Sequence, residues 1–376
     1  MATSYALLST YPPTQCGLAT FTAALLAQLR QSGDRAFVVR VLDEPGGQAG
    51  TEVVQDLVTG SAASAAAAVE TLNGFDVVIV QHEYGIYGGP DGQDVVSLVE
   101  ALHVPTMVVL HTVLSDPSAR QRAILNALIA SAGAVVTMTQ TARARLLEHY
   151  QANPEKVRVI PHGAADNRVR ASPGAGRPRV LTWGLLGPGK GIEHAIDAMR
   201  ILRDRGLQAD YVVAGQTHPR VLAHNGEAYR RNLESRARAR GVAGQVHFDD
   251  RFLPAAALSQ LIGSASVVLL PYDSREQVTS GVLIEAVTAG KPVVSTCFPH
   301  ATELLTGGAG LLVGRQDPHG IAGALQRVLS EPGLSAGMSR RSAELAPGLL
   351  WPAVANSYRD LAATLTARGV TAGAAA

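Results

Sequence analysis

The chain has 376 residues, is 47% hydrophobic and 17% charged, and is therefore long enough for two compact domains. Its net charge of +1 gives no electrostatic case for binding nucleic acid or a strongly anionic membrane. The two cysteines, Cys16 and Cys297, lack metal-ligand spacing, so we expect no disulfide framework, no metal site and a cytoplasmic location. We find no signal peptide and no apolar run of ~20 residues, so a membrane-spanning segment is not expected, although peripheral membrane contact stays open. The composition does not predict an oligomeric state.

The first half of the chain alternates between strand and helix patterns. Short apolar runs predict strands at residues 5–9, 37–42, 77–80, 106–110, 134–138 and 157–160. Helical spacing or alanine content predicts helices at residues 18–30, 62–72, 125–130 and 141–150. Cys16 and Gly17 stand in the first loop, just before a helix, where backbone N–H groups can meet an anion or simply form a tight turn.

Polar residues follow two of these strands. His82, Glu83 and Tyr84 belong to the run QHEYGIYGG, and His111 follows the strand at 106–110. Buried polar groups cost free energy unless they meet a ligand or one another, so these strand ends predict a site at the carboxyl edge of a parallel sheet. The alternative is structural, with His82 bonded to a loop carbonyl and His111 satisfied in the core.

Residues 164–178 lose apolar periodicity and predict a linker. After it, strands are expected at residues 180–183, 211–214, 246–248, 267–270, 293–294 and 310–313, and helices at 192–203, 230–240 and 281–289. The sequence GLLGPGKG, from Gly184 to Gly191, precedes a helix and offers backbone donors and Lys190 to a phosphate. It lacks the spacing of a Walker A loop. Lys190 could instead be a solvated charge that caps the helix.

The stretch YDSREQVTSGVLIEAVTAGKPVV, residues 272–294, predicts a strand, loop, helix and strand. Ser280 can cap the helix, Gly281 allows a ligand close to the backbone, and the first N–H groups favour an anion. Glu285, one turn later, can accept hydrogen bonds from hydroxyl groups. A phosphate beside a hydroxyl-rich group describes a sugar nucleotide. An ordinary crossover with a solvated Glu285 is the alternative.

This stretch resembles the signature of the retaining GT-B glycosyltransferases of family 4, in which two glutamates are separated by seven residues that include a Gly, and Ala-x-x-x-Gly-x-Pro-Val-Val follows the second. Glu285, Gly290 and Pro292 fit the pattern, and GLLGPGKG and QHEYG resemble other elements of the family. The first acid does not match, because its spacing falls on Gln277 with Glu276 one place earlier. Leu185 stands where the family usually has an arginine.

The resemblance implies an α/β fold of the GT-B class, with two doubly wound Rossmann-like domains facing across a cleft. It implies an acceptor-side domain at residues 1–168, completed by a helix at 351–367 that crosses back, and a nucleotide-sugar domain at 178–350. We expect residues 368–376 to be a disordered tail.

The resemblance also assigns site residues by analogy. Catalytic roles are expected for His111, Lys190, Glu83 and His82. Donor or nucleotide binding is expected from Gly17, Gly184, Lys190, Arg251, Gln277, Ser280, Gly281, Val282 and Glu285. The acceptor side is expected to include Cys16, His82, Glu83 and Tyr84.

The implied reaction transfers a hexose, mannose or glucose, from a GDP- or UDP-sugar to a hydroxyl of a sugar or glycoconjugate. It retains the anomeric configuration and uses no metal or other cofactor. Two alternatives remain: a nucleotide-sugar-binding protein without turnover, and a phosphorylase-like enzyme that uses free phosphate.

Overall fold

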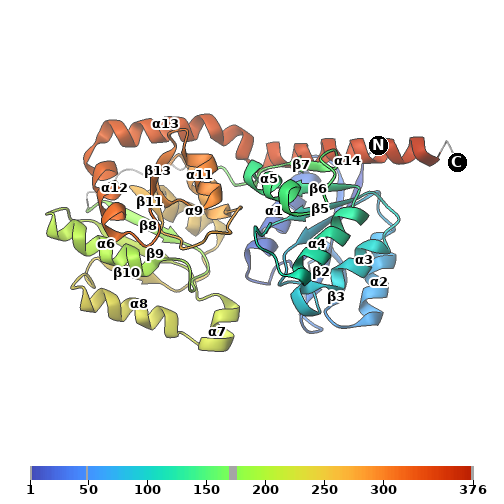
Figure 1. Ribbon diagram of the computed structural model, residues 1–376, viewed down its shortest axis with the longest axis horizontal. Coiled ribbons are helices and arrows are strands. Elements are labelled where there is room, and N and C mark those ends of the chain that lie inside the picture. The colour runs from blue at the N-terminus through green and yellow to red at the C-terminus, as the bar shows by residue number, and fades with distance from the viewer. Residues whose placement is uncertain (1, 48–49, 169–175, 374–376) are drawn as a thin grey trace. The chain divides into compact units, whose positions relative to one another are not determined.

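The computed structural model describes residues 2–47, 50–168 and 176–373 and divides into two compact units, each with its own parallel sheet (Figure 1). Unit 1 comprises Met1–Gly163 and Trp351–Ala376, and unit 2 comprises Ala164–Leu350. The division falls at Gly163, so residues 164–168 belong to unit 2. Residues 169–175 of the expected linker lie outside the described residues. No helix in the described ranges is long and apolar enough to cross a membrane.

The sheet of unit 1 has seven parallel strands in the order β3-β2-β1-β4-β5-β6-β7. They are β1 (Ser4–Ser9), β2 (Arg35–Leu42), β3 (Val53–Val58), β4 (Val77–His82), β5 (Thr106–Leu110), β6 (Ala134–Thr137) and β7 (Val157–Val159). The central strands β1, β4 and β5 are almost wholly buried, which explains their continuous apolar runs. The order reverses between β1 and β4, and the carboxyl edge at such a switch is where ligands of open α/β sheets bind.

In the described part of unit 1, seven helical segments accompany this sheet: α1 (Gly17–Gln31), α2 (Ala62–Leu72), the 3-10 turn η1 (Pro90–Gly92), α3 (Asp94–Glu100), α4 (Ala119–Ser131), α5 (Gln140–His149) and α14 (Trp351–Gly373). The apolar stripe of α1, including Phe21 and Leu25, shares one core with Trp351 and Tyr358 of α14. The last helix of the chain therefore completes unit 1. It remains helical to Gly373, through most of the segment expected to be a tail, and residues 374–376 lie outside the described part.

The sheet of unit 2 has six parallel strands in the order β10-β9-β8-β11-β12-β13. They are β8 (Arg179–Trp183), β9 (Asp210–Ala214), β10 (Val246–Asp249), β11 (Val267–Leu270), β12 (Val293–Thr296) and β13 (Gly310–Val313). Its helices are α6 (Ile192–Asp204), α7 (Pro219–Asn225), α8 (Ala228–Ala239), α9 (Ala255–Ser264), α10 (Gly281–Thr288), α11 (Pro299–Leu305), α12 (Pro318–Ser330) and α13 (Pro332–Leu349). The strand order reverses between β8 and β11, so the loops that follow these two strands lie side by side at the carboxyl edge of the sheet.

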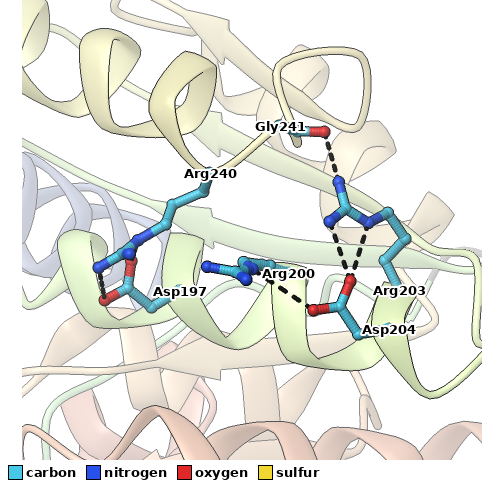
Figure 2. A network of polar contacts seen from close by, with 6 residues as sticks. All are labelled: Asp197, Arg200, Arg203, Asp204, Arg240 and Gly241. Atoms are coloured by element: carbon cyan, nitrogen blue, oxygen red, sulfur yellow. Dashed lines mark hydrogen bonds and ion pairs between the residues drawn. The ribbon is translucent and has the colours of Figure 1, made fainter.

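Helix α6 is joined to the end of α8 by charged side chains (Figure 2). The Asp197 carboxylate forms ion pairs with Arg236, at 2.6 Å from Nη2 to Oδ2, and with Arg240, at 2.8 Å from Nε to Oδ1. The side chain of Asp197 is only 15% exposed. Arg203 pairs with the more exposed Asp204 and donates to the Gly241 carbonyl at 2.6 Å. Two arginines, Arg236 within α8 and Arg240 at its C-terminal end, therefore fasten α8 to α6 through Asp197.

Candidate functional site

In unit 2, the loops after β8 and β11 lie directly against each other. Gly191 has φ +65°, and a Cβ there would overlap the carbonyl oxygen of Pro271. Asp273 N donates to Gly189 O at 2.9 Å. Glycine is therefore required where the two backbones touch, and the contact brings the GLLGPGKG loop beside the stretch that leads into α10.

Lys190 lies at this contact. Its Nζ is 4.4 Å from the centroid of the Tyr272 ring, a cation–π geometry, and that ring stacks on Phe298 at 5.3 Å. Burial lowers the pKa of Lys190 to about 8. The ammonium thus sits in a poorly solvated place, where an anion would gain more from it than in water.

The start of α10 is fixed by two hydrogen bonds. Ser280 Oγ accepts from Leu283 N at 3.3 Å, as a cap, and Ser280 N donates to the buried ring of His300 at 2.8 Å. His300 N also donates to Gln277 O at 3.4 Å. The N–H groups of Gly281 and Val282, in the first turn, have no acceptor within the helix and can bind an anion.

Glu285 completes this edge. Trp183 Nε1, at the end of β8, donates to Glu285 Oε2 at 3.0 Å. Burial raises the pKa of Glu285, and the hydrogen bond from Trp183 opposes that rise. A Cβ on Gly184 would lie 3.6 Å from Val282 Cγ2. The structure therefore brings Gly184, Val282 and Glu285 together around the start of α10.

The remaining donor-side residues of unit 2 lie on other parts of the loops. Arg251 follows β10 and has a side chain 73% exposed, whose guanidinium donates two hydrogen bonds to the Asp249 carboxylate, at 2.8 and 2.7 Å. Gln277 and Glu276 are half-buried on the loop before α10. The backbone of Gln277 is held from both sides, since its N–H also donates to Ser274 Oγ at 3.2 Å.

In unit 1, β4 runs to His82, so Gln81 and His82 lie in the strand rather than in the loop expected there. His111, just after β5, contacts Gln81 Oε1 through Nε2 at 2.7 Å, and its N–H donates to His82 O at 3.1 Å. With Gln81 Oε1 as acceptor, the ring proton of His111 lies on Nε2. Burial, with His162 and His82 nearby, lowers the pKa of His111 to about 3, so the ring is neutral at physiological pH.

His82 is almost fully buried, and neither ring nitrogen has a hydrogen-bond partner among the described residues. The expected structural alternative, a bond to a loop carbonyl, is therefore not seen. Its ring packs edge-on against Tyr84 at 5.0 Å, and burial lowers its pKa to about 4. Glu83 points elsewhere: it accepts from Thr112 Oγ1 at 2.6 Å and from Tyr84 N at 3.0 Å, which ties the ends of β4 and β5.

Phe21 of α1 packs between His111 and two further aromatic residues, His162 and Trp351. Its ring is edge-on to His111 at 5.1 Å, to His162 at 5.0 Å and to Trp351 at 4.9 Å. Burial lowers the pKa of His162 to about 4, although its bond to Gly163 O opposes this. Two neutral imidazoles are thus positioned by one aromatic ring.

Cys16 and Gly17 lie at the start of α1. Cys16 Sγ caps the helix by accepting from Ala19 N at 3.4 Å, and it lies 3.2 Å from Thr10 Oγ1. Gly17 is exposed, and an added Cβ would meet nothing within 4 Å. The fold itself therefore does not require glycine at position 17.

The sequence analysis did not single out Trp183, Tyr272, His300 or His218 as site residues. The only available signal was position, because Trp183 ends a strand, and His300 and His218 each follow a strand at the same edge of the sheet. Among the described residues, no three His, Cys, Asp or Glu side chains are grouped so that they could hold a metal ion.

Two family models match the chain, one within each half. The model described as Glycosyltransferase Family 4 matches residues 16–168, and the model described as Glycosyl transferases group 1 matches residues 177–331. The first match contains the unit 1 cluster around His111, and the second contains Lys190 and the start of α10.

A curated relative, the D-inositol 3-phosphate glycosyltransferase of Acidothermus cellulolyticus, is 30% identical over 259 residues, which is 62% of this chain. The chain spans only 54% of that relative's length.

Two solved structures share the architecture. Anabaena HepE in complex with UDP superposes with a TM-score of 0.76 at 18% identity, covering 96% of this chain and 100% of HepE. Sucrose-phosphate synthase from Thermosynechococcus elongatus gives a TM-score of 0.78 at 19% identity, covering 97% of this chain and 100% of that one. Identities this low show the fold alone, and the fold agrees with both family matches. The expectation is confirmed: this chain belongs to glycosyltransferase family 4, the group 1 glycosyl transferases, and has the GT-B fold of two Rossmann-like domains.

Proposed function

We propose that this protein is a retaining glycosyltransferase that moves a hexose, glucose or mannose, from a nucleoside diphosphate sugar to a hydroxyl of a sugar or glycoconjugate. The observation that carries the proposal is the carboxyl edge of unit 2. There Lys190 lies over Tyr272, the capped start of α10 offers free N–H groups, and Glu285 is held by Trp183.

These groups suit a nucleotide sugar in three ways. The ammonium of Lys190 and the N–H groups of Gly281 and Val282 stabilise negative charge that builds on the leaving diphosphate. The carboxylate of Glu285 accepts hydrogen bonds from the ribose hydroxyls. Gln277, on the loop before α10, contacts the donor sugar.

Unit 1 supplies the groups for the sugar and the acceptor in this proposal. Neutral His111 donates its Nε2–H to Gln81, so its Nδ1 accepts a hydrogen bond from a hydroxyl of the donor sugar. His82, Glu83 and Tyr84 serve the acceptor side with Cys16. In the transfer, the bond from the anomeric carbon to the diphosphate oxygen breaks, and a bond to the acceptor oxygen forms on the same face. The acceptor proton passes to the leaving phosphate oxygen, so the reaction needs no metal or other cofactor.

The nucleotide and the location are also proposals. HepE was solved with UDP and with UDP-glucose, so UDP-glucose is the first donor to test, followed by GDP-mannose. We propose a cytoplasmic location because Cys16 and Cys297 are both free thiols.

The test is incubation with UDP-glucose or GDP-mannose, with and without sugar acceptors and D-inositol 3-phosphate. A glycosyltransferase releases the nucleoside diphosphate in step with glycosylated product, and the product anomer reports retention. Binding without release would instead support a nucleotide-sugar-binding protein. Hexose 1-phosphate formed from a glycoside and free phosphate would support a phosphorylase. Absence of binding to every donor would overturn the proposal.

A further inference from the structure

The segment after β9 is paired with the loop that carries Lys190. Leu186 N donates to Gln216 O at 2.9 Å, and His218 N donates to Leu186 O at 2.8 Å. These bonds form a parallel bridge between Leu186 and Thr217. A Cβ on Gly187 would lie 3.2 Å from Val221 Cγ2. Residues 216–221 therefore lie directly on the Gly184–Gly191 loop.

Polar contacts, rather than core packing, hold this segment in place. Helix α7 contains no buried residue. Thr217, just before α7, is linked to Glu227, just after it, because Thr217 Oγ1 donates to Glu227 Oε2 at 2.5 Å. The buried Arg230 donates to Gly215 O at 2.7 Å and lies 3.4 Å from the same Glu227 oxygen. This fixation sets the position of His218 relative to Lys190.

The ring of His218 has a defined protonation state. Its Nδ1 accepts from Arg220 N at 3.2 Å, so in the neutral ring the proton must lie on Nε2. Burial, followed by the charges of Arg220 and Lys190, lowers the pKa of His218. At neutral pH the ring therefore offers one N–H donor, close enough to Lys190 to be influenced by its charge.

Lys190 is the only charged residue between Gly184 and Gly191. A nucleoside diphosphate carries more than one negative charge and many acceptor oxygens, so one ammonium leaves most of them unpaired. A neutral N–H donor beside Lys190 can bind a second oxygen without repelling the ammonium.

We propose that His218 is a donor-binding residue whose Nε2–H donates a hydrogen bond to a diphosphate oxygen held by Lys190. This inference rests on the proposed function and adds a residue to that site.

Two substitutions distinguish the role of Nδ1, which caps α7, from that of Nε2, which is proposed to bind the diphosphate. His218→Asn retains an acceptor close to Nδ1, which can still cap the start of α7, but cannot reach the position of Nε2. His218→Gln places an amide N–H close to Nε2 but gives up the cap. His224→Asn is the matched control, because His224 is an exposed histidine within α7, the helix that His218 caps.

Calorimetry measures UDP and GDP binding to the wild type and the three variants, and ligand-detected NMR measures uridine and guanosine, which lack phosphates. We expect His218→Asn to weaken binding of the preferred diphosphate by about tenfold or more, as for a lost hydrogen bond to a charged group, with nucleoside binding unchanged. His218→Gln should retain most of the affinity, and His224→Asn should match the wild type.

Diphosphate affinity within twofold of the wild type in His218→Asn would overturn the inference and leave the proposed function standing. Equal losses for diphosphate and nucleoside would also overturn it, because they would indicate a general disturbance of α7. Failure of the wild type to bind either diphosphate would overturn both.

Discussion

The amino group of Lys190 is expected to make the reaction sensitive to alkaline pH. Because burial lowers its pKa to about 8, the free enzyme loses this positive charge as the pH rises through 8. We therefore expect kcat/KM for the donor to fall above pH 8 in the wild type, while Lys190→Arg, which stays charged, shows no fall in this range. Lys190→Ala should lower kcat by ~10²–10³ at pH 7.

Initial rates over a pH series, with unfolding temperatures as a check on folding, measure both effects. A wild-type profile that is flat through pH 8, or near-normal kcat in Lys190→Ala, would contradict the assignment.

Glu285 is expected to bind the ribose rather than the phosphates. Glu285→Gln should weaken UDP and UDP-sugar binding by a similar factor, because both ligands share the ribose. The decisive control is 2′,3′-dideoxy-UDP, which lacks the hydroxyl groups: its affinity should be nearly the same for both proteins. If the substitution weakens the dideoxy ligand as strongly as UDP, Glu285 acts through the structure of the site instead.

The loop before α10 offers two candidates for the sugar contact, and we favour Gln277 over Glu276. The backbone of Gln277 is fixed by Ser274 and His300, which suits a residue that must hold a ligand. Gln277→Ala is expected to lower kcat/KM for the donor by an amount equivalent to ~1–3 kcal/mol, the cost of an unpaired buried group. Glu276→Ala should change it little. Steady-state kinetics of both variants decides, and the reverse pattern would assign the role to Glu276.

Sequence analysis found Lys190, Ser280 and Glu285 because each belongs to a local pattern of glycines, caps and helical turns. It did not find His300 or His218, whose partners lie 20 or more residues away or on a neighbouring loop, so no spacing in the sequence reveals them. Sequence analysis found His82 but did not predict that it lies buried inside β4. Every residue of this parallel strand is buried, so the strand has no alternation of polar and apolar residues that would mark where it ends.

At the scale of elements, the strands with continuous apolar runs were predicted closely, and the helix at 62–72 agrees with α2 residue for residue. β3 was missed because it is an edge strand that contains Gln55 and Asp56 and has one buried residue. Helix α13 was missed because glycines and Pro347 interrupt its pattern. Helix α7 has no buried face at all, so no hydrophobic periodicity could indicate it.

The junction of α6 and α8 gives a prediction for stability. Asp197→Asn removes the charge that pairs with Arg236 and Arg240, and we expect it to lower the free energy of unfolding by about 1–2 kcal/mol. Asp204→Asn is the matched control on the same helix, and since its side chain is 49% exposed and its ion pairs are screened by solvent, we expect its urea denaturation midpoint to stay close to that of the wild type. Urea denaturation of the three proteins measures the difference.

The pH dependence provides a second check on Asp197. Burial opposes ionisation, but the hydrogen bonds from Arg236 and Arg240 prevail and lower the pKa of Asp197 below the ordinary 3.8. The stabilisation is therefore complete above pH 3.8 and is lost as the pH falls below it. The difference in free energy of unfolding between the wild type and Asp197→Asn should therefore become smaller below pH 3.8. If the Asp197 and Asp204 variants lose the same free energy of unfolding at neutral pH, the ion pairs of Asp197 with Arg236 and Arg240 have no special role in stability.

At the scale of the whole molecule, two residues close together in sequence belong to different cores. Trp351 packs with Phe21 in unit 1, and a Cβ on Gly163 would overlap its ring. Leu349, two positions earlier, packs with Ala164 and Leu181 in unit 2. Sequence analysis could assign the return of the chain to the first domain only by resemblance, because the helical pattern of 351–367 does not say which core it joins.

This arrangement predicts that the two units unfold in separable transitions. Trp351→Ala should destabilise the unit 1 transition by ~3–5 kcal/mol and Leu349→Ala the unit 2 transition by ~2–5 kcal/mol, the usual costs of deleting large buried side chains. A saturating nucleoside diphosphate identifies unit 2, since ligand at ~100 times its Kd stabilises the unit that binds it by ~2.7 kcal/mol. Differential scanning calorimetry with and without ligand measures all three shifts. The assignment of α14 to the core of unit 1 fails if Trp351→Ala lowers the ligand-sensitive transition, and the separation of the units fails if both variants shift a single common one.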